Sequence, residues 1–452
     1  MTKLLIKNRC KQAAAEAVPI LMVLIGAALV AFSLGPYNNW DTQLEFEAAS
    51  NINRLGLPYV ESFGTSIDQP PLGFYLEAAF LSVFGSSTGT TVTLVTFLGV
   101  GCTFAVYLLG RGLCGKTAGL FAAAFFGLNP WHIVLSRSGL IDVQCLLLSL
   151  LCLYVGIYAI RRDSSKLTVV TGLLFSAAFL TKFYAVFILI PLFLLYIYAK
   201  PKNTKRILNQ VVMFAVPTAL FFFVWYRIVL GGSLLSIFNH NDFIYVIPSN
   251  TNVVASPFFA TNFLLNYGLG VFLVGATVFS LLFGFLIRKQ SPKTALTHLL
   301  CLVTIAAVLA ANVVLGFVFG LNVPYFSAVK YLYQGLPFFA LLVGSLAASA
   351  TSLCRETKTV LNAKKNRYVA AISLVLLVAS LASTVYYTNA ASMRDYLQYF
   401  VEPNIDYGYA LLNPTPLTLE SPLMSLQLLG FAAVLCGLLL AVGQKLLWPS
   451  KL

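Results

Sequence analysis

Long apolar stretches alternate with short polar and mostly basic segments along the chain, and this pattern predicts an all-α membrane protein. A bilayer core of about 30 Å needs roughly 20 helical residues, and apolar runs of about that length recur from end to end. The pattern predicts about twelve transmembrane helices, at residues 17–35, 89–110, 117–135, 139–160, 167–181, 184–199, 207–230, 262–287, 295–319, 331–353, 368–387 and 423–443. Basic residues flank 167–199 on both sides, which favours a hairpin with its apex at Thr181-Lys182 over a single crossing.

The charged residues divide unevenly between the two sides that these spans define. One side holds 23 of the 29 Lys and Arg residues but only 3 of the 15 Asp and Glu residues. The positive-inside rule therefore places this side, with both chain termini, in the cytoplasm of a multi-pass protein of the cell membrane. The net charge of +14 reports orientation and attraction to membrane lipid, so we expect no nucleic-acid partner.

Composition agrees with this class, because 59% hydrophobic and 10% charged residues exclude a water-soluble globule. We expect residues 1–452 to form a single transmembrane domain without a separate soluble domain. Its outer loops are 36–88, 231–261 and 388–422. The first apolar run is longer than the core of a secretory signal, so an uncleaved first helix is expected. None of the eight cysteines falls in an outer loop, and their spacing supports neither a disulfide framework nor a zinc motif.

The first outer loop is long and carries two predicted surface helices. The segment TQLEFEAASNINRLG has helical character, with Asp41 as a candidate N-cap and Gly56 as the stop. Pro70-Pro71 then opens a second, amphipathic stretch, LGFYLEAAFLSVFG, which is too short to cross the bilayer. We therefore expect both helices to lie at the outer membrane surface.

Carboxylates in this loop are candidates for chemistry. Asp41 follows the first span at interface depth, where a partly desolvated carboxylate is able to act as a base, although its position alone favours a helix cap. Glu45 and Glu47 are expected on a solvated helix face. Asp68 is a candidate helix cap, metal ligand or substrate contact.

Bases near the outer face form the complementary set. Arg137 and Asp142 flank the start of the fourth span, either as an ion pair or as parts of a site. Lys182 and Lys330-Tyr331 have no carboxylate nearby in the sequence, which favours an anionic ligand such as a lipid phosphate over snorkelling.

The three histidines are scattered along the chain. His240, in the outer loop 231–261, is a candidate ligand or substrate contact, and His298 is expected to be structural. The sequence requires no cofactor and leaves a divalent metal open.

In order along the chain, these motifs resemble the GT-C membrane glycosyltransferases, in particular the branch of dolichyl-phosphate-mannose protein mannosyltransferases and aminoarabinose lipid A transferases. The matching elements are Trp40-Asp41 with Glu47-Ala48-Ala49, Asp68-Gln69-Pro70-Pro71, Asn129-Pro130, Ser136-Arg137-Ser138-Gly139-Leu140-Ile141-Asp142, Leu180-Thr181-Lys182, Lys330-Tyr331 and Leu336-Pro337. The resemblance covers residues 1–340. It departs from the family pattern at Thr42, where related chains often have Glu, and at Gln69, where some have a basic residue.

The resemblance implies an enzyme that moves a hexose or pentose, with inversion, from a polyprenyl-phosphate donor to a protein, lipid or glycan acceptor at the outer face. Asp41 would be the catalytic base. Lys182, Lys330, Tyr331 and Arg137 would hold the donor phosphate and stabilise its charge. A further set would bind substrate or support the site: Asp68, Gln69, Asp142, Glu47 and His240.

Two other classes of function fit the same pattern. A carrier or flippase for lipid-linked sugars would also need bases within the membrane, although matching halves with broken helices are absent from the sequence pattern. A noncatalytic subunit of a membrane assembly is the third alternative.

Overall fold

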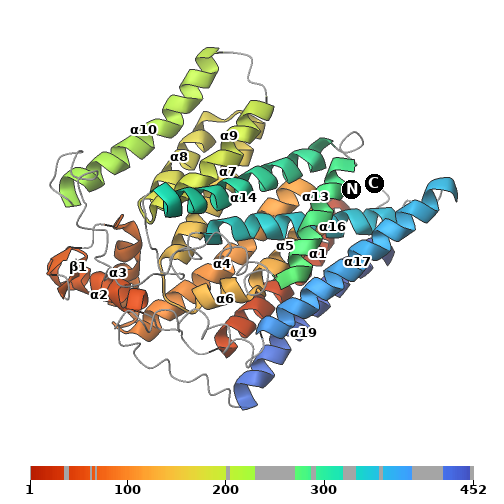
Figure 1. The fold of residues 1–452 in the computed structure, drawn as a ribbon, viewed down its shortest axis with the longest axis horizontal. Helices are drawn as coiled ribbons and strands as arrows, with labels where there is room; N and C mark the ends of the chain where they lie inside the picture. The colour runs from red at the N-terminus through yellow and green to blue at the C-terminus, as the bar shows by residue number, and fades with distance from the viewer. Residues whose placement is uncertain are drawn as a thin grey trace.

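The computed structural model describes residues 2–34, 40–61, 64–66, 69–199, 204–229, 270–286, 292–318, 332–355, 360–388 and 421–447. These residues form helices and one two-stranded hairpin (Figure 1). The elements of the first part are α1 (Thr2–Ser33), α2 (Trp40–Leu55), β1 (Tyr59–Val60), β2 (Thr65–Ser66), α3 (Leu72–Phe84), α4 (Thr88–Cys114), α5 (Lys116–Gly127), α6 (Pro130–Ser136) and α7 (Asp142–Arg162). The second part contains α8 (Ser165–Phe179), the 3-10 helix η2 (Phe183–Ile188), α9 (Leu189–Tyr198), α10 (Thr204–Val229), α13 (Gly270–Leu286), α14 (Pro292–Val318), the 3-10 helix η5 (Tyr333–Gly335), α16 (Leu336–Arg355), α17 (Val360–Thr388) and α19 (Ser421–Leu447).

The prediction of an all-α, polytopic membrane protein is confirmed. Within the described residues, six helices are long and apolar enough to cross a membrane, and the bent pair α5–α6 is a seventh candidate. The other predicted spans coincide with shorter apolar helices in α1, α8, η2–α9, α13 and α17. The predicted interruption at Thr181-Lys182 is also present, because α8 ends at Phe179 and η2 begins at Phe183.

The predicted third span, 117–135, is wrong in one respect, because it is a broken helix. Helices α5 and α6 meet at an angle of 64°. Pro130 has no N–H to donate to the preceding turn, and it therefore starts a new helix. Asn129 caps that helix by accepting a hydrogen bond from the Trp131 N–H at 3.0 Å.

Close helix contacts through glycine build the centre of the bundle. A Cβ on Gly119 of α5 would lie 2.5 Å from the Tyr107 carbonyl oxygen of α4, and one on Gly344 of α16 would lie 2.2 Å from the Ala118 carbonyl oxygen. Gly26 of α1 faces Gly430 of α19 in the same way. Small residues let the backbones approach, so these helices pack mainly by shape. The main hydrophobic core runs through this region.

Helices α2 and α3 and the β1–β2 hairpin lie together at one end of the bundle (Figure 1), and we call them the outer layer. Both helices predicted for this segment are present: α2 ends before Gly56, whose φ of +77° suits glycine, and α3 starts just after Pro70-Pro71. Two small hydrophobic clusters separate from the main core hold the layer together. The hairpin, in which Tyr59 pairs with Ser66, was not anticipated from the sequence.

The opposite end of the bundle carries bases. Helix α4 runs from beside α3 to Cys114, and α7 runs from Asp142 to Arg162. Their far ends meet, since both terminal nitrogens of Arg161 donate to the Gly112 carbonyl oxygen at 3.1 Å. The outer layer and the basic turns are thus at opposite ends, as the predicted topology requires.

Candidate active site

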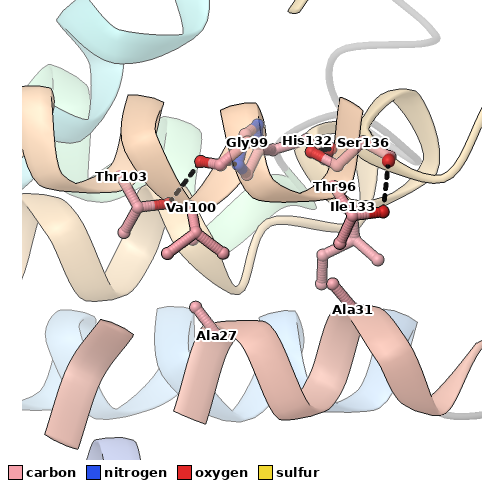
Figure 2. A pocket seen from close by; sticks show the side chains of 10 residues that line it. Ala27, Ala31, Thr96, Gly99, Val100, Thr103, His132, Ile133 and Ser136 are labelled. Atoms are coloured by element: carbon pink, nitrogen blue, oxygen red, sulfur yellow. Dashed lines mark hydrogen bonds between the residues drawn. The ribbon is translucent and has the colours of Figure 1, made fainter. Parts of the chain in front are cut away.

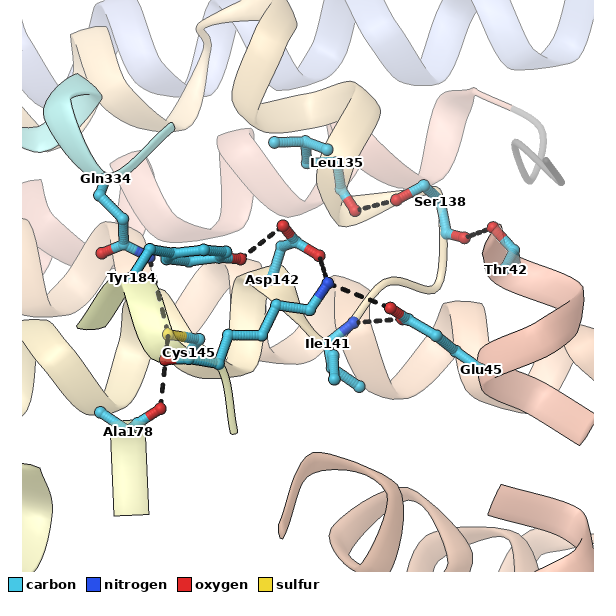
Figure 3. Close-up of polar contacts among 11 residues, drawn as sticks. Thr42, Glu45, Leu135, Ser138, Ile141, Asp142, Cys145, Ala178, Tyr184 and Gln334 are labelled. Carbon is cyan, nitrogen blue, oxygen red and sulfur yellow. Dashed lines mark hydrogen bonds and ion pairs between the residues drawn. The ribbon is translucent and has the colours of Figure 1, made fainter. Parts of the chain in front are cut away.

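A buried ion cluster joins the outer layer to the bundle (Figure 3). Lys182 Nζ donates to Asp142 Oδ2 at 2.7 Å and to Glu45 Oε1 at 3.2 Å. The Tyr184 hydroxyl donates to the second oxygen of Asp142 at 2.5 Å. The side chains of Lys182, Glu45 and Asp142 are only 8%, 3% and 0% exposed. A buried charge is costly unless it is paired, so these three groups depend on one another.

Each charged side chain of this cluster comes from a different element. Asp142 occupies the first turn of α7, where a carboxylate also interacts favourably with the helix N-terminus. Lys182 lies in the extended backbone between α8 and η2, with φ −154° and ψ 141°. Glu45 lies on α2, three and four residues before the buried Ala48 and Ala49. The cluster therefore holds segments together that are far apart in the sequence.

Glu45 also fastens α2 to the loop before α7. Its second carboxylate oxygen accepts a hydrogen bond from the Ile141 N–H at 2.9 Å. One turn earlier on α2, the Thr42 hydroxyl donates to the Ser138 carbonyl oxygen. The expectation that Glu45 lies on a solvated face is wrong. Its spacing from Ala48 and Ala49, on the apolar face of the helix, was the signal that it is buried.

Asp41 lies in the first turn of α2, one turn before Glu45. The helix starts at Trp40, so Asp41 lies inside the helix. The alternative that placed Asp41 at the N-cap is therefore not supported. The structure does not describe the side chain of Asp41. The backbone position puts Asp41 on the helix that Glu45 and Thr42 hold against the ion cluster.

Arg137 is buried beside the cluster but makes its own contacts. Its Nε donates to the Leu34 carbonyl oxygen at 3.1 Å and its NH1 to Thr96 Oγ1 at 3.0 Å, and its guanidinium carbon lies 5.4 Å from the centre of the Phe32 ring. The Asp142 carboxylate bonds to Lys182 and Tyr184. A role of Arg137 in the site stays a prediction.

Glu77 of α3 is a second buried carboxyl group that sequence reasoning missed. Its side chain is fully buried, and its Oε1 accepts a hydrogen bond from the Thr91 hydroxyl at 2.6 Å. Its Oε2 has no hydrogen-bond partner in the described part of the chain. Burial raises the pKa of Glu77 well above its usual range, the Thr91 hydrogen bond lowers it, and the charge of Glu45 raises it further. Glu77 is therefore a second buried carboxyl group whose protonated form burial favours.

His132 belongs to a separate polar network, around a small pocket between α1, α4 and α6 (Figure 2). Its Nε2 lies 3.1 Å from the Gly99 carbonyl oxygen and its Nδ1 lies 2.6 Å from the Tyr333 hydroxyl. Nε2 must donate to the carbonyl oxygen, so Nδ1 accepts from Tyr333. Thr96 and Ser136, which also line this pocket, bond to backbone oxygens. We interpret this network as structural.

Several predicted site residues lie outside the described ranges: Asp68, His240, Lys330 and Tyr331. The described chain resumes at Leu332, and Gln334 Nε2 is 3.8 Å from Cys145 Sγ on α7, one turn after Asp142. Gln69 is half-buried just before α3. Glu47 lies two residues after Glu45 and accepts a hydrogen bond from the Glu61 N–H at 2.7 Å, so it supports the β1–β2 hairpin.

Metal binding was left open by the sequence. Searching the residues that the structure describes finds no group of three or more His, Cys, Asp or Glu side chains able to hold a metal ion. His298, expected to be structural, is buried with its Nε2 2.5 Å from the Ser345 hydroxyl and 3.2 Å from that of Ser280.

The fold is that of a membrane protein with the architecture of the GT-C glycosyltransferases. The structure of ArnT from Cupriavidus metallidurans bound to undecaprenyl phosphate superposes with a TM-score of 0.51 at 16% identity, over 96% of this chain and 77% of ArnT. The oligosaccharyltransferase of Archaeoglobus fulgidus, tethered to an acceptor peptide, has a TM-score of 0.51 at 15% identity, over 88% of this chain and 59% of that one.

Sequence comparison narrows the resemblance within this class. Residues 68–226 match the model of the family described as dolichyl-phosphate-mannose-protein mannosyltransferase. The chain is 25% identical over 207 residues to YycA of Bacillus subtilis (strain 168), a protein named as a putative mannosyltransferase. That match covers 43% of this chain and 29% of YycA. The resemblance inferred from the motifs is thus confirmed: the chain has the GT-C fold and, in its first half, the sequence pattern of the protein mannosyltransferases.

Proposed function

We propose that the chain is an inverting glycosyltransferase that moves a sugar from a polyprenyl phosphate to an acceptor at the outer membrane face. The matching family is described by its use of dolichyl phosphate mannose, and ArnT, which shares the fold, was crystallised with undecaprenyl phosphate. Both relationships favour a lipid-linked donor. The donor sugar is a hexose or pentose, and the acceptor is a protein, a lipid or a glycan.

One observation carries this proposal. Lys182, a buried cation, lies at the end of the bundle where α2 brings in Asp41. A base and a phosphate-binding cation are the two groups that this transfer needs. Asp142 orients the ammonium through its 2.7 Å ion pair, and Tyr184 in turn holds Asp142.

The reaction is a single displacement at the anomeric carbon. The acceptor oxygen or nitrogen forms a bond to that carbon while the bond from carbon to the phosphate oxygen breaks, and this inverts the configuration. The Asp41 carboxylate takes the proton of the acceptor. The electron pair of the broken bond leaves with the lipid phosphate, whose added charge needs cations close by.

The phosphate in this scheme is held by Lys182 and Arg137, joined by Lys330 and Tyr331. Arg137 is bound to the end of α1 through the Leu34 carbonyl oxygen, so the first span takes part in positioning it. Asp68, Gln69 and His240 are assigned to substrate contacts, and Asp142 and Glu47 to support of the site.

The test is transfer of a labelled sugar from a polyprenyl-phosphate donor by the purified protein. We expect Asp41→Asn to lower kcat by about 10²- to 10⁴-fold, the usual contribution of a general base. The matched control is Asp163→Asn, the same change at the other end of the bundle, where Asp163 accepts a hydrogen bond from Gln210. Asp163 has a φ of 50°, which asparagine also tolerates, so this variant should keep its activity.

Normal turnover by the Asp41→Asn enzyme would remove Asp41 from the mechanism. Movement of the donor across liposomes without transfer would make the chain a carrier. If the folded protein neither transfers the sugar nor moves the donor, a noncatalytic subunit is favoured.

A further inference from the structure

Lys182 has two carboxylate partners that differ in distance and in attachment to the bundle. We propose that Glu45 is a positioning residue that competes with the donor phosphate for the Lys182 ammonium and thereby links donor binding to the position of helix α2. This proposal rests on the proposed function, because it takes the ligand of Lys182 to be a lipid phosphate.

Burial of Lys182 makes its carboxylate partners competitors of an incoming anion. Its side chain is only 8% exposed, and its nitrogen donates to Asp142 and Glu45. A phosphate oxygen that reaches this nitrogen competes with these two carboxylates for one buried positive charge. An ammonium has three donors in a compact head, so partners of like charge compete for the same space.

Glu45 is the partner that can yield. Asp142 is at the shorter distance, 2.7 Å against 3.2 Å, lies in the first turn of a membrane-spanning helix and is held by Tyr184 as well. Glu45 belongs to the outer layer, where Leu44 and Ala48 pack in a small cluster separate from the main core. Moving Glu45 disturbs this small cluster, whereas moving Asp142 disturbs the bundle.

Release of Glu45 has a direct effect on α2. The polar bonds that join α2 to the segment from α6 to Lys182 include those of Thr42 to Ser138, Glu45 to Ile141 and Glu45 to Lys182. Loss of the ionic bond weakens this attachment of α2. Because Asp41 lies one turn from Glu45, occupancy of the phosphate site is transmitted to the helix that carries the proposed base.

The chemistry of transfer gives this competition a direction. The donor is a phosphate diester with one negative charge, whereas the product lipid phosphate is a monoester that carries up to two, because its second pKa is about 6. The product therefore binds Lys182 more strongly than the donor does. Competition from Glu45 opposes this difference and favours release of the product.

The experiment measures binding of undecaprenyl phosphate to the full-length protein in nanodiscs, with amide hydrogen exchange over residues 40–55. Glu45→Gln keeps the shape of the side chain and removes its charge, so we expect about tenfold tighter binding. We also expect the lipid to increase exchange in wild-type α2, and exchange in the variant to be high with or without lipid. Glu45→Asp, which keeps the charge, should restore the wild-type response.

Glu61→Gln is the matched control, since it removes a carboxylate of the outer layer that pairs with Arg54 and is 60% exposed. It should leave affinity unchanged. The proposal is overturned if Glu45→Gln binds the lipid no more tightly than wild type, or if amide hydrogen exchange in wild-type α2 is the same with and without lipid. Lys182→Gln separates this proposal from the proposed function. If Lys182→Gln binds undecaprenyl phosphate as tightly as wild type, Lys182 is not part of the phosphate site. If Lys182→Gln loses affinity but Glu45→Gln has no effect, only the competition between Glu45 and the phosphate is overturned.

Discussion

The outer layer and the centre of the bundle bury polar and apolar groups in opposite ways. At the centre, α4, α5 and α16 approach through Gly119 and Gly344 and are surrounded by apolar side chains. In the outer layer and at its junction with the bundle, the carboxyl groups of Glu45, Glu77 and Asp142 are buried beside small hydrophobic clusters. The centre is specified by shape, and the junction is specified by charge.

This difference separates scaffold from chemistry. Interactions at the centre are short-ranged and depend on volume, so we expect changes there to alter stability and leave binding per folded molecule intact. Interactions at the junction depend on protonation and on ions, so changes there should alter stability, binding and pH response together.

The largest effect is expected from Lys182→Met. It leaves the carboxylates of Glu45 and Asp142 buried without their cation, and breaking a buried pair in this way costs about 3–5 kcal/mol. Thermal unfolding in detergent would measure the loss, and sugar transfer should disappear as well. Lys166→Met, at an exposed position on the opposite end, should stay within about 0.5 kcal/mol of wild type. Equal melting temperatures for both variants would show that the junction does not depend on the cluster.

A smaller effect, on stability alone, is expected from Gly119→Ala. The added methyl group would lie 2.5 Å from the Tyr107 carbonyl oxygen and force α4 and α5 apart, at a cost of about 1–3 kcal/mol. Undecaprenyl phosphate affinity of the remaining folded protein should not change. Gly112→Ala on α4 is the control, because nothing lies within 4 Å of the new atom and the helix gains about 0.5–1 kcal/mol. A change in affinity with Gly119→Ala would break the separation of scaffold and chemistry.

The smallest effect is the pH dependence of the junction. The folded-state pKa of Glu77 is raised above its unfolded value near 4.5, so the folded chain binds more protons between the two values. Stability should therefore fall as pH rises through this window, by at most about 1.4 kcal/mol per pH unit, and the loss is complete above the folded-state pKa. Glu77→Gln, which stays neutral, should flatten this part of the curve. Identical melting profiles for both proteins above pH 4.5 would contradict a protonated Glu77.

Much of the scaffold could be predicted from the sequence, because hydrophobicity and bilayer thickness act locally along the chain. The spans, the surface helices and the end of α2 at Gly56 all follow from runs of apolar residues and from turn-forming residues. Asn129-Pro130 is a clear local signal for a helix break. The prediction nevertheless placed it inside one span, because apolar residues continue on both sides of it.

The site could be predicted only in part. Lys182 and Asp142 stood out as ionisable groups near span ends, but they are 40 positions apart, and no local pattern indicates that they pair. Glu45 was missed for the same reason, because its partner is 137 positions away. A carboxylate on the apolar face of α2 was the available evidence that such a partner had to exist.

The distance in sequence between Glu45 and Lys182 also sets an order of assembly. Helix α2 is synthesised 137 residues before the lysine that neutralises it, and α3 bonds through the Leu72 N–H to the Leu180 carbonyl oxygen just before that lysine. During synthesis, the Glu45 carboxylate must therefore remain without its ammonium partner until the chain up to Lys182 has been made. We infer that the buried ion cluster closes late in biogenesis, and that a chain stalled before Lys182 has α2 without this junction.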